Sequence, residues 1–152
     1  MNLTQILKPD CVKVPLKSKE KEAAIVELIE LLDKTDHLQN KQDVIKAVLE
    51  REKTGSTGIG SGVAIPHGKC KAAKDFVMAI GIADEPIDFK SIDKKPVKIV
   101  ILLISPLDQT ELHIQALASV SSLMFDAKFK QRMENAESAQ EFYQLICSRD
   151  NT

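Results

Sequence analysis

Two short apolar runs constrain the fold of this chain more than any other part of its sequence. Val77–Ile82 and Val97–Ile104 are apolar at odd and even positions alike, as is typical of strands that are covered on both faces. Each run is too short for a typical buried helix, and each is followed by a turn that contains proline, Pro86 or Pro106. The sequence therefore predicts a sheet whose central strands lie between helices.

Helices are predicted where apolar residues recur every three or four positions. One stripe follows Ser18, a candidate N-terminal cap, and a second follows Asn40 and ends near Lys53. A third contains His113 and follows Thr110, another candidate cap. The predicted helices span about 19–34, 40–53, 110–124 and 138–148, and shorter strands are expected around 12–14, 63–65 and 87–89. The fold class is thus α/β, with layers of helix, sheet and helix.

Composition narrows the class of protein. A chain of 152 residues, 43% of them hydrophobic, predicts one globular domain over residues 1–152 that needs neither metal nor disulfide to form a core. The 21 Lys+Arg are balanced by 22 Asp+Glu, which argues against nucleic-acid binding. Three cysteines without a C-x-x-C spacing, no signal-peptide pattern, and no long apolar run predict a cytoplasmic protein without membrane insertion.

Five of the six glycines lie between Gly55 and Gly68. Glycine-rich backbone can turn its N–H groups toward an anion. A Walker A loop is excluded because Ser61 and Gly62 occupy the positions of its Lys and Ser/Thr, and a dinucleotide fingerprint is excluded because Val63 replaces its third glycine. The segment therefore predicts an anion cradle of another kind.

The glycine segment ends in Pro66-His67-Gly68, which predicts an imidazole held in one orientation. Neutral imidazole is available near pH 7, and one ring nitrogen can act as a nucleophile toward a phosphoryl or acyl group. The other nitrogen must then donate to a fixed acceptor, such as a backbone carbonyl. Arg51, in the last turn of the preceding helix, and His113 would complete a phosphohistidine site.

Each of these residues also has a purely structural interpretation. His67 can be a turn histidine with local hydrogen bonds, Arg51 a solvated cation at a helix end, and His113 a core histidine. The spacing of His67 and Cys70 raises the question of zinc, but no second close pair of ligands supports it, and we predict no metal. Cys70, between two lysines, is also a candidate nucleophile, although packing is the commoner role of such a cysteine.

The run Arg51-Glu-Lys-x-Gly-Ser-Thr-Gly-Ile-Gly-x-Gly-Val-Ala-Ile-Pro-His67-Gly resembles the phosphorylation segment of a known family. That family is the fructose/mannitol-type IIA proteins (EIIA type 2) of the bacterial phosphotransferase system (PTS). Two further motifs, over residues 86–97 and 106–113, are most similar to its nitrogen-regulatory branch. The resemblance covers almost the whole chain and implies a three-layer α/β/α sandwich with a mixed, about five-stranded sheet.

The resemblance also implies a role for each residue of the site. His67 is the phosphoacceptor, at Nε2, while Arg51 is the cation over the phosphoryl oxygens and His113 hydrogen-bonds them. Ser56 and Thr57 are further candidate donors. The phosphoryl donor is a small histidine-containing phosphocarrier protein of the HPr/NPr type, charged from phosphoenolpyruvate, and no cofactor is required.

Two functions remain open under this resemblance. In the first, the protein is a regulatory switch that binds targets, such as potassium-transport or sensor-kinase proteins, according to the phosphorylation of His67. In the second, it is a relay subunit that passes the phosphoryl group to a sugar-permease IIB domain for fructose/mannitol-type uptake. Similarity to the nitrogen branch favours the switch.

Overall fold

The computed structural model describes residues 2–150 of the chain. Six strands and five α-helices are found in this part, after a short 3-10 turn, η1. In chain order the elements are η1 (Leu3–Gln5), β1 (Leu7–Leu16), α1 (Lys21–Lys34), α2 (Lys41–Lys53), β2 (Gly58–Gly60), β3 (Val63–Ala64), β4 (His67–Lys69), β5 (Val77–Ile87), β6 (Val97–Ser105), α3 (Thr110–Met124), α4 (Ala127–Glu134) and α5 (Ala139–Asp150).

The strands form one mixed sheet in the order β1-β5-β6-β3-β2, with β4 also paired to β6. β5 and β6 are antiparallel, and their register runs from Val77 opposite Ile104 to Ile87 opposite Val97. β1 is parallel to β5, and both β3 and β4 are parallel to β6. The prediction of a mixed sheet is confirmed, with six strands in place of about five.

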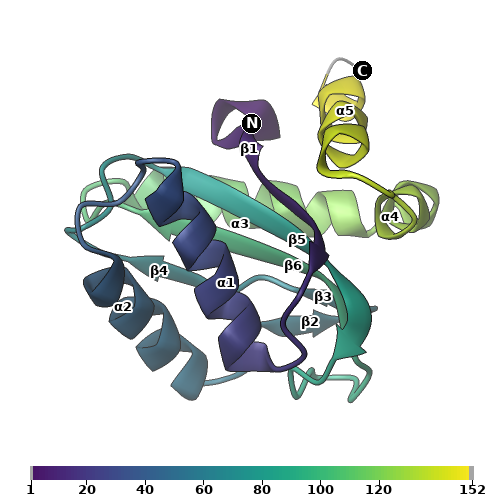
Figure 1. Cartoon of the computed structure of the whole chain (residues 1–152), viewed down its shortest axis with the longest axis horizontal. Coiled ribbons are helices and arrows are strands. Elements are labelled where there is room, and N and C mark those ends of the chain that lie inside the picture. The colour runs from purple at the N-terminus through teal and green to yellow at the C-terminus, as the bar shows by residue number, and fades with distance from the viewer. Residues whose placement is uncertain (1, 151–152) are drawn as a thin grey trace.

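Helices cover both faces of this sheet. Figure 1 shows α1 and α2 on one face and α3 on the other, while α5 packs beside β1 and η1. Every residue of β6 except Lys98 is buried, and so are residues 77–83 of β5. The predicted three-layer arrangement is therefore confirmed. Within residues 2–150, no helix combines the length and apolarity needed to cross a membrane.

The helix starts were predicted with mixed success. The Asn40 side chain accepts a hydrogen bond from the Asp43 N–H at 3.2 Å, so this cap is confirmed. The other two assignments are wrong. α1 begins at Lys21 because Ser18 donates instead to the carboxylate of Glu27, and Thr110 is already the first residue of α3.

Several shorter elements differ from those predicted. Helix α4 is not among the predicted helices, although Asp126 caps it at Phe129 N–H and Phe129 and Met133 are buried one turn apart. The strand expected at 87–89 is wrong, because Ile87 ends β5 itself. β1 spans Leu7–Leu16 instead of 12–14, and its register with β5 shifts twice, which hides its apolar alternation.

Strand β4 places His67 between helix α2 and the C-terminal end of β6. His67 is opposite Leu103 in β6, two residues before β6 ends at Ser105. α2 packs against β4, and a Cβ atom on Gly68 would lie 3.1 Å from Val48 Cγ2. Glycine at this position therefore allows the middle of α2 to approach the strand that carries His67.

We predict that Gly81→Ala destabilises the protein, because a Cβ atom there would overlap with the side chain of Leu16, between β5 and β1. The expected loss in free energy of unfolding is about 1–3 kcal/mol, as for other overpacked cores. Gly55→Ala is the control, since no atom lies within 4 Å of its Cβ position. Urea denaturation measures both, and equal free energies of unfolding for the two variants would contradict the packing described.

Candidate functional site

His67 is fixed by hydrogen bonds to its ring and to the residues before it. The Pro66 carbonyl accepts a hydrogen bond from Leu103 N–H at 3.0 Å, which ties the start of β4 to β6. Ring atom Nδ1 lies 2.8 Å from the carbonyl oxygen of Ile65. Because a carbonyl oxygen only accepts, Nδ1 carries the proton and Nε2 has the free lone pair. The Ile65 carbonyl is thus the fixed acceptor that the sequence analysis required.

His113 lies beside His67 and is almost completely buried. The two ring centroids are 5.3 Å apart, with an edge-to-face angle of 63°. Nδ1 of His113 lies 2.8 Å from the hydroxyl oxygen of Ser105, which is itself fully buried at the end of β6. The first turn of α3 and the end of β6 therefore hold the second imidazole against the first.

Arg51 completes the group from the last turn of α2. Its Nη1 donates to the Gly55 carbonyl at 3.0 Å and to the Thr54 hydroxyl at 3.2 Å. A pocket of about 390 Å³ is lined by Arg51, His67 and His113 together with Ala47, Gly68, Lys69 and Leu117. The structure thus brings together the three residues singled out from the sequence.

Lys69 is a cation of this pocket that the sequence analysis did not assign to it. It stands two residues after His67 on β4, and its Nζ donates to the Thr110 hydroxyl at 2.9 Å. Residues i and i+2 of a strand share a face, so the alternation of β4 was the signal for its placement. The pocket therefore has two cationic side chains and two imidazoles.

The surroundings of His67 and His113 favour the neutral form of each ring. Burial lowers the pKa of His67, Arg51 lowers it further, and the Ile65 carbonyl and Glu52 act in the opposite direction. Burial, helped by the nearby His67 and Lys69, lowers the pKa of His113 from 6.5 to about 4. A neutral His67 has its Nε2 lone pair available, as a nucleophile requires.

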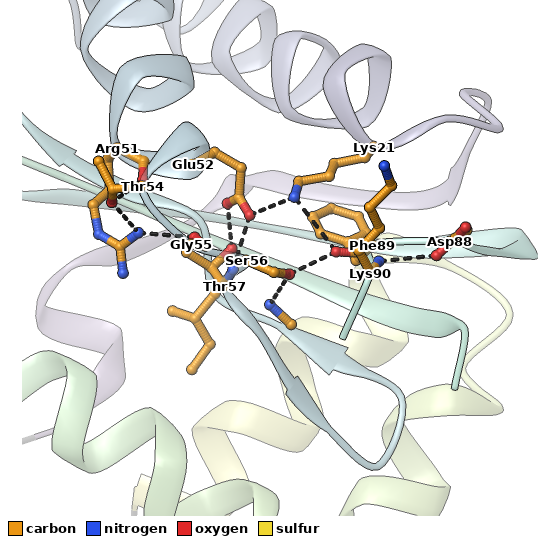
Figure 2. Close-up of polar contacts among 12 residues, drawn as sticks. Lys21, Arg51, Glu52, Thr54, Gly55, Ser56, Thr57, Asp88, Phe89 and Lys90 are labelled. Atoms are coloured by element: carbon orange, nitrogen blue, oxygen red, sulfur yellow. Dashed lines mark hydrogen bonds and ion pairs between the residues drawn. The ribbon is translucent and has the colours of Figure 1, made fainter. Parts of the chain in front are cut away.

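Ser56 and Thr57 are hydrogen-bonded to Phe89 and Glu52 (Figure 2), neither of which lines the pocket. The Ser56 hydroxyl donates to the Phe89 carbonyl at 2.6 Å, and the buried Thr57 hydroxyl donates to the Glu52 carboxylate. Neither residue is among those that line the pocket around His67. Their role as donors to a phosphoryl group stays a prediction, and the geometry favours a structural role.

The expectation of a glycine-built anion cradle at His67 is not met. The N–H groups of Thr57, Gly58 and Ser61 donate to Glu52, to the Ser56 hydroxyl and to Asp93. The glycine segment instead forms the β2–β3 hairpin, where Gly60 and Gly62 have φ of 100° and 81°. Such values favour glycine, so these residues shape a turn.

The cysteines give little support to metal or thiol chemistry at this pocket. Among residues 2–150, the potential ligand group is Asp10, Cys11 and His37, and it includes neither His67 nor Cys70. Burial raises the pKa of the Cys11 thiol to about 11, which keeps it protonated. The potential metal-ligand group of residues 2–150 therefore lies outside this pocket.

The family model for the phosphoenolpyruvate-dependent sugar phosphotransferase system, EIIA 2, matches residues 5–148. The chain belongs to this EIIA 2 family. It is 36% identical to a nitrogen regulatory protein of Escherichia coli K12 over 100% of this chain and 93% of that protein. It is also 32% identical to the fructose-specific EIIABC component of Bacillus subtilis, with 99% of this chain covering 24% of that protein.

A solved structure of another EIIA 2 relative supports the fold. The nitrogen regulatory protein IIA-Ntr of Neisseria meningitidis superposes with a TM-score of 0.85 at 29% identity, covering 93% of this chain and 97% of that chain. The mannitol IIA of Escherichia coli, at 23% identity and a TM-score of 0.79, shares the fold. These comparisons confirm the family that the sequence motifs indicated.

The buried histidines predict that stability falls as the solution is acidified. A group whose pKa is lowered on folding stabilises the protein above its unfolded pKa, and that contribution disappears as the pH falls toward the folded pKa. For His113 the interval runs from 6.5 down to about 4. Wild type should lose about 2 kcal/mol through this residue between pH 7 and pH 4.5.

Urea denaturation at a series of pH values measures this loss, with His113→Gln as the comparison. The variant should have a shallower dependence between pH 6.5 and 4.5, with the remaining slope due in part to His67. Glu27, whose pKa is lowered from 4.5 to about 2, contributes mainly below this interval. Equal slopes in the two proteins would show that His113 is not buried in its neutral form.

Proposed function

We propose that this EIIA 2 protein is a phosphoryl carrier that receives a phosphoryl group on His67 and acts as a phosphorylation-dependent regulator. The observation that carries the proposal is the hydrogen bond from His67 Nδ1 to the Ile65 carbonyl. It leaves Nε2 as the nucleophilic atom in a pocket that also contains Arg51 and His113. The domain is taken to span residues 1–152, and the family model covers 5–148 of them.

The proposed reaction moves a phosphoryl group from one imidazole to another, so that one N–P bond forms as another breaks. The lone pair of His67 Nε2 attacks phosphorus in the phosphohistidine of the carrier protein, and the carrier nitrogen takes back the electron pair of its breaking N–P bond. His67 Nδ1 keeps its proton throughout and donates a hydrogen bond to the Ile65 carbonyl. The group that moves spreads negative charge over three oxygens, and fixed donors stabilise that charge.

Arg51 and His113 are the proposed donors to those oxygens. The guanidinium of Arg51 supplies a permanent positive charge at one side of the pocket. If the buried Ser105 hydroxyl donates to Nδ1 of His113, the Nε2 of that ring is protonated and can donate to the phosphoryl group. The phosphoryl donor is a histidine phosphocarrier protein of the HPr/NPr type.

The relative that this chain covers over most of its own length favours the regulatory function over the sugar relay. The nitrogen regulatory protein of Escherichia coli is covered to 93%, whereas only 24% of the fructose-specific EIIABC component is covered. Phosphorylation adds up to about two negative charges at the pocket, which can change a docking surface. The proposed targets include potassium-transport or sensor-kinase proteins, and the alternative partner is a sugar-permease IIB domain.

We predict that His67→Ala abolishes phosphorylation. Labelled phosphoenolpyruvate, the general PTS enzyme and a histidine phosphocarrier protein should give wild type an acid-labile, base-stable label, as expected of a phosphoramidate. His37→Ala is the control, because His37 lies elsewhere, 3.6 Å from Asp75. A label that persists in His67→Ala would sink the assignment. Adding a IIB domain then separates the two functions, since loss of the label to IIB supports the relay.

We predict that Arg51→Ala slows phosphoryl transfer by roughly 100-fold, the usual effect of removing one charge-stabilising donor. Arg51→Lys should recover part of the rate, because it restores the charge but not the planar guanidinium. Arg132→Ala, at an exposed position on α4, is the matched control. Rapid-quench measurement of the first turnover gives the rates, and unchanged kinetics in Arg51→Ala would reduce Arg51 to a helix-end cation.

A further inference from the structure

A buried ion pair lies immediately behind the glycine segment. The side chain of Glu52 is 5% exposed, and its carboxylate lies 2.7 Å from Lys21 Nζ. Lys21 is held in turn by the Phe89 carbonyl at 3.4 Å and lies over the ring of Phe89. A carboxylate buried this deeply is costly unless it is paired and hydrogen-bonded. The Lys21–Glu52 pair is therefore not an ordinary surface ion pair, and its burial calls for a further role.

Glu52 uses both carboxylate oxygens on a single residue of the loop. Oε2 accepts the Thr57 N–H at 2.8 Å, and Oε1 accepts the Thr57 hydroxyl proton. In Figure 2 this carboxylate lies between Thr57 and Lys21, while the Arg51 side chain points elsewhere. Two bonds to one residue fix its backbone as well as its side chain.

Thr57 connects this ion pair to the nucleophile. The Thr57 carbonyl accepts the N–H of Ile65 at 3.0 Å. The carbonyl of Ile65 then accepts the Nδ1 proton of His67 at 2.8 Å. A continuous series of hydrogen bonds thus runs from Lys21 and Glu52 through Thr57 and Ile65 to the ring of His67.

We propose that the Lys21–Glu52 ion pair is a positioning device for His67, acting through Thr57 and the Ile65 carbonyl. It fixes the acceptor that holds the Nδ1 proton and so keeps the lone pair on Nε2. Glu52 and Lys21 are not among the residues that line the pocket, so they are positioning residues and not catalytic ones. This inference rests on the proposed function, because it assigns the Nε2 lone pair of His67 to phosphoryl transfer.

The chain contains a second ion pair of almost the same design, which serves as a control. Glu27 lies 2.8 Å from Lys13 Nζ and accepts both the N–H and the hydroxyl proton of Ser18. Like Glu52, it joins a helix to a nearby loop, but its bonds lead to the Lys17–Ser18 segment and not to His67. If the two ion pairs only stabilised the fold, neither of them would affect His67 more than the other.

The test compares Glu52→Gln with Glu27→Gln in the full chain. Nitrogen-15 NMR of the His67 ring reports the tautomer, and rapid-quench transfer from the phosphocarrier protein reports the rate. Glu52→Gln should populate both tautomers and slow phosphoryl transfer by up to about 100-fold, since a displacement of a reacting group by about 1 Å can have an effect of this size. Glu27→Gln should keep the wild-type tautomer and rate, even if it unfolds more easily.

A second pair of variants keeps the test decisive if Glu52→Gln does not fold. Thr57→Val removes the hydroxyl that donates to Glu52, whereas Thr57→Ser retains it. We expect a mixed tautomer and slower transfer in the valine variant, and recovery of both in the serine variant.

The outcomes separate this inference from the proposed function. If wild type is phosphorylated on His67 but Glu52→Gln and Thr57→Val match Glu27→Gln in tautomer and rate, the inference is overturned and the function stands. If wild type is not phosphorylated at His67, the proposed function fails, while the tautomer measurement still reports whether Glu52 positions the ring.

Discussion

The antiparallel pairing of β5 with β6 is the interaction on which the other elements depend. Both strands are buried on both faces, so helices must cover the sheet on either side. β5 occupies one edge of β6, which leaves the other edge to β3 and β4. His67 therefore lies beside the end of β6, and His113 follows that end in the first turn of α3. The two imidazoles meet because both are placed by the same strand.

Burial at this point suits the chemistry of a neutral nucleophile. Burial is the main cause of the lowered pKa of both imidazoles, and the neighbouring His67, whose ring centroid is 5.3 Å away, lowers the pKa of His113 further. Arg51 acts in the same direction on His67. In the proposed function the same cation also attracts the oxygens of the incoming phosphoryl group, so its charge would act on both reaction partners.

The apolar patterns and the residue types at the site could be read from the sequence, but the partners of polar groups could not. The central strands and the stripe through His113 follow from side-chain periodicity, and the motif ending at His67 predicts the nucleophile of the proposed function. Glu52 gave no such signal, because a charged residue near a helix end is usually solvated. Whether the N–H of Thr57 meets a ligand or a buried carboxylate depends on tertiary packing. For that reason the glycine segment was interpreted as a cradle when it forms a hairpin.

The last turn of α2 holds the glycine segment at two points through neighbouring residues of opposite charge. Arg51 bonds to Thr54 and Gly55, and Glu52 bonds to Thr57. These anchors differ in exposure, because the contacts of Arg51 are exposed whereas those of Glu52 are buried. Arg51 can therefore exchange its contacts for the oxygens of a ligand without releasing Thr57. The buried anchor keeps the loop in place, and this leaves the exposed cation available to the pocket.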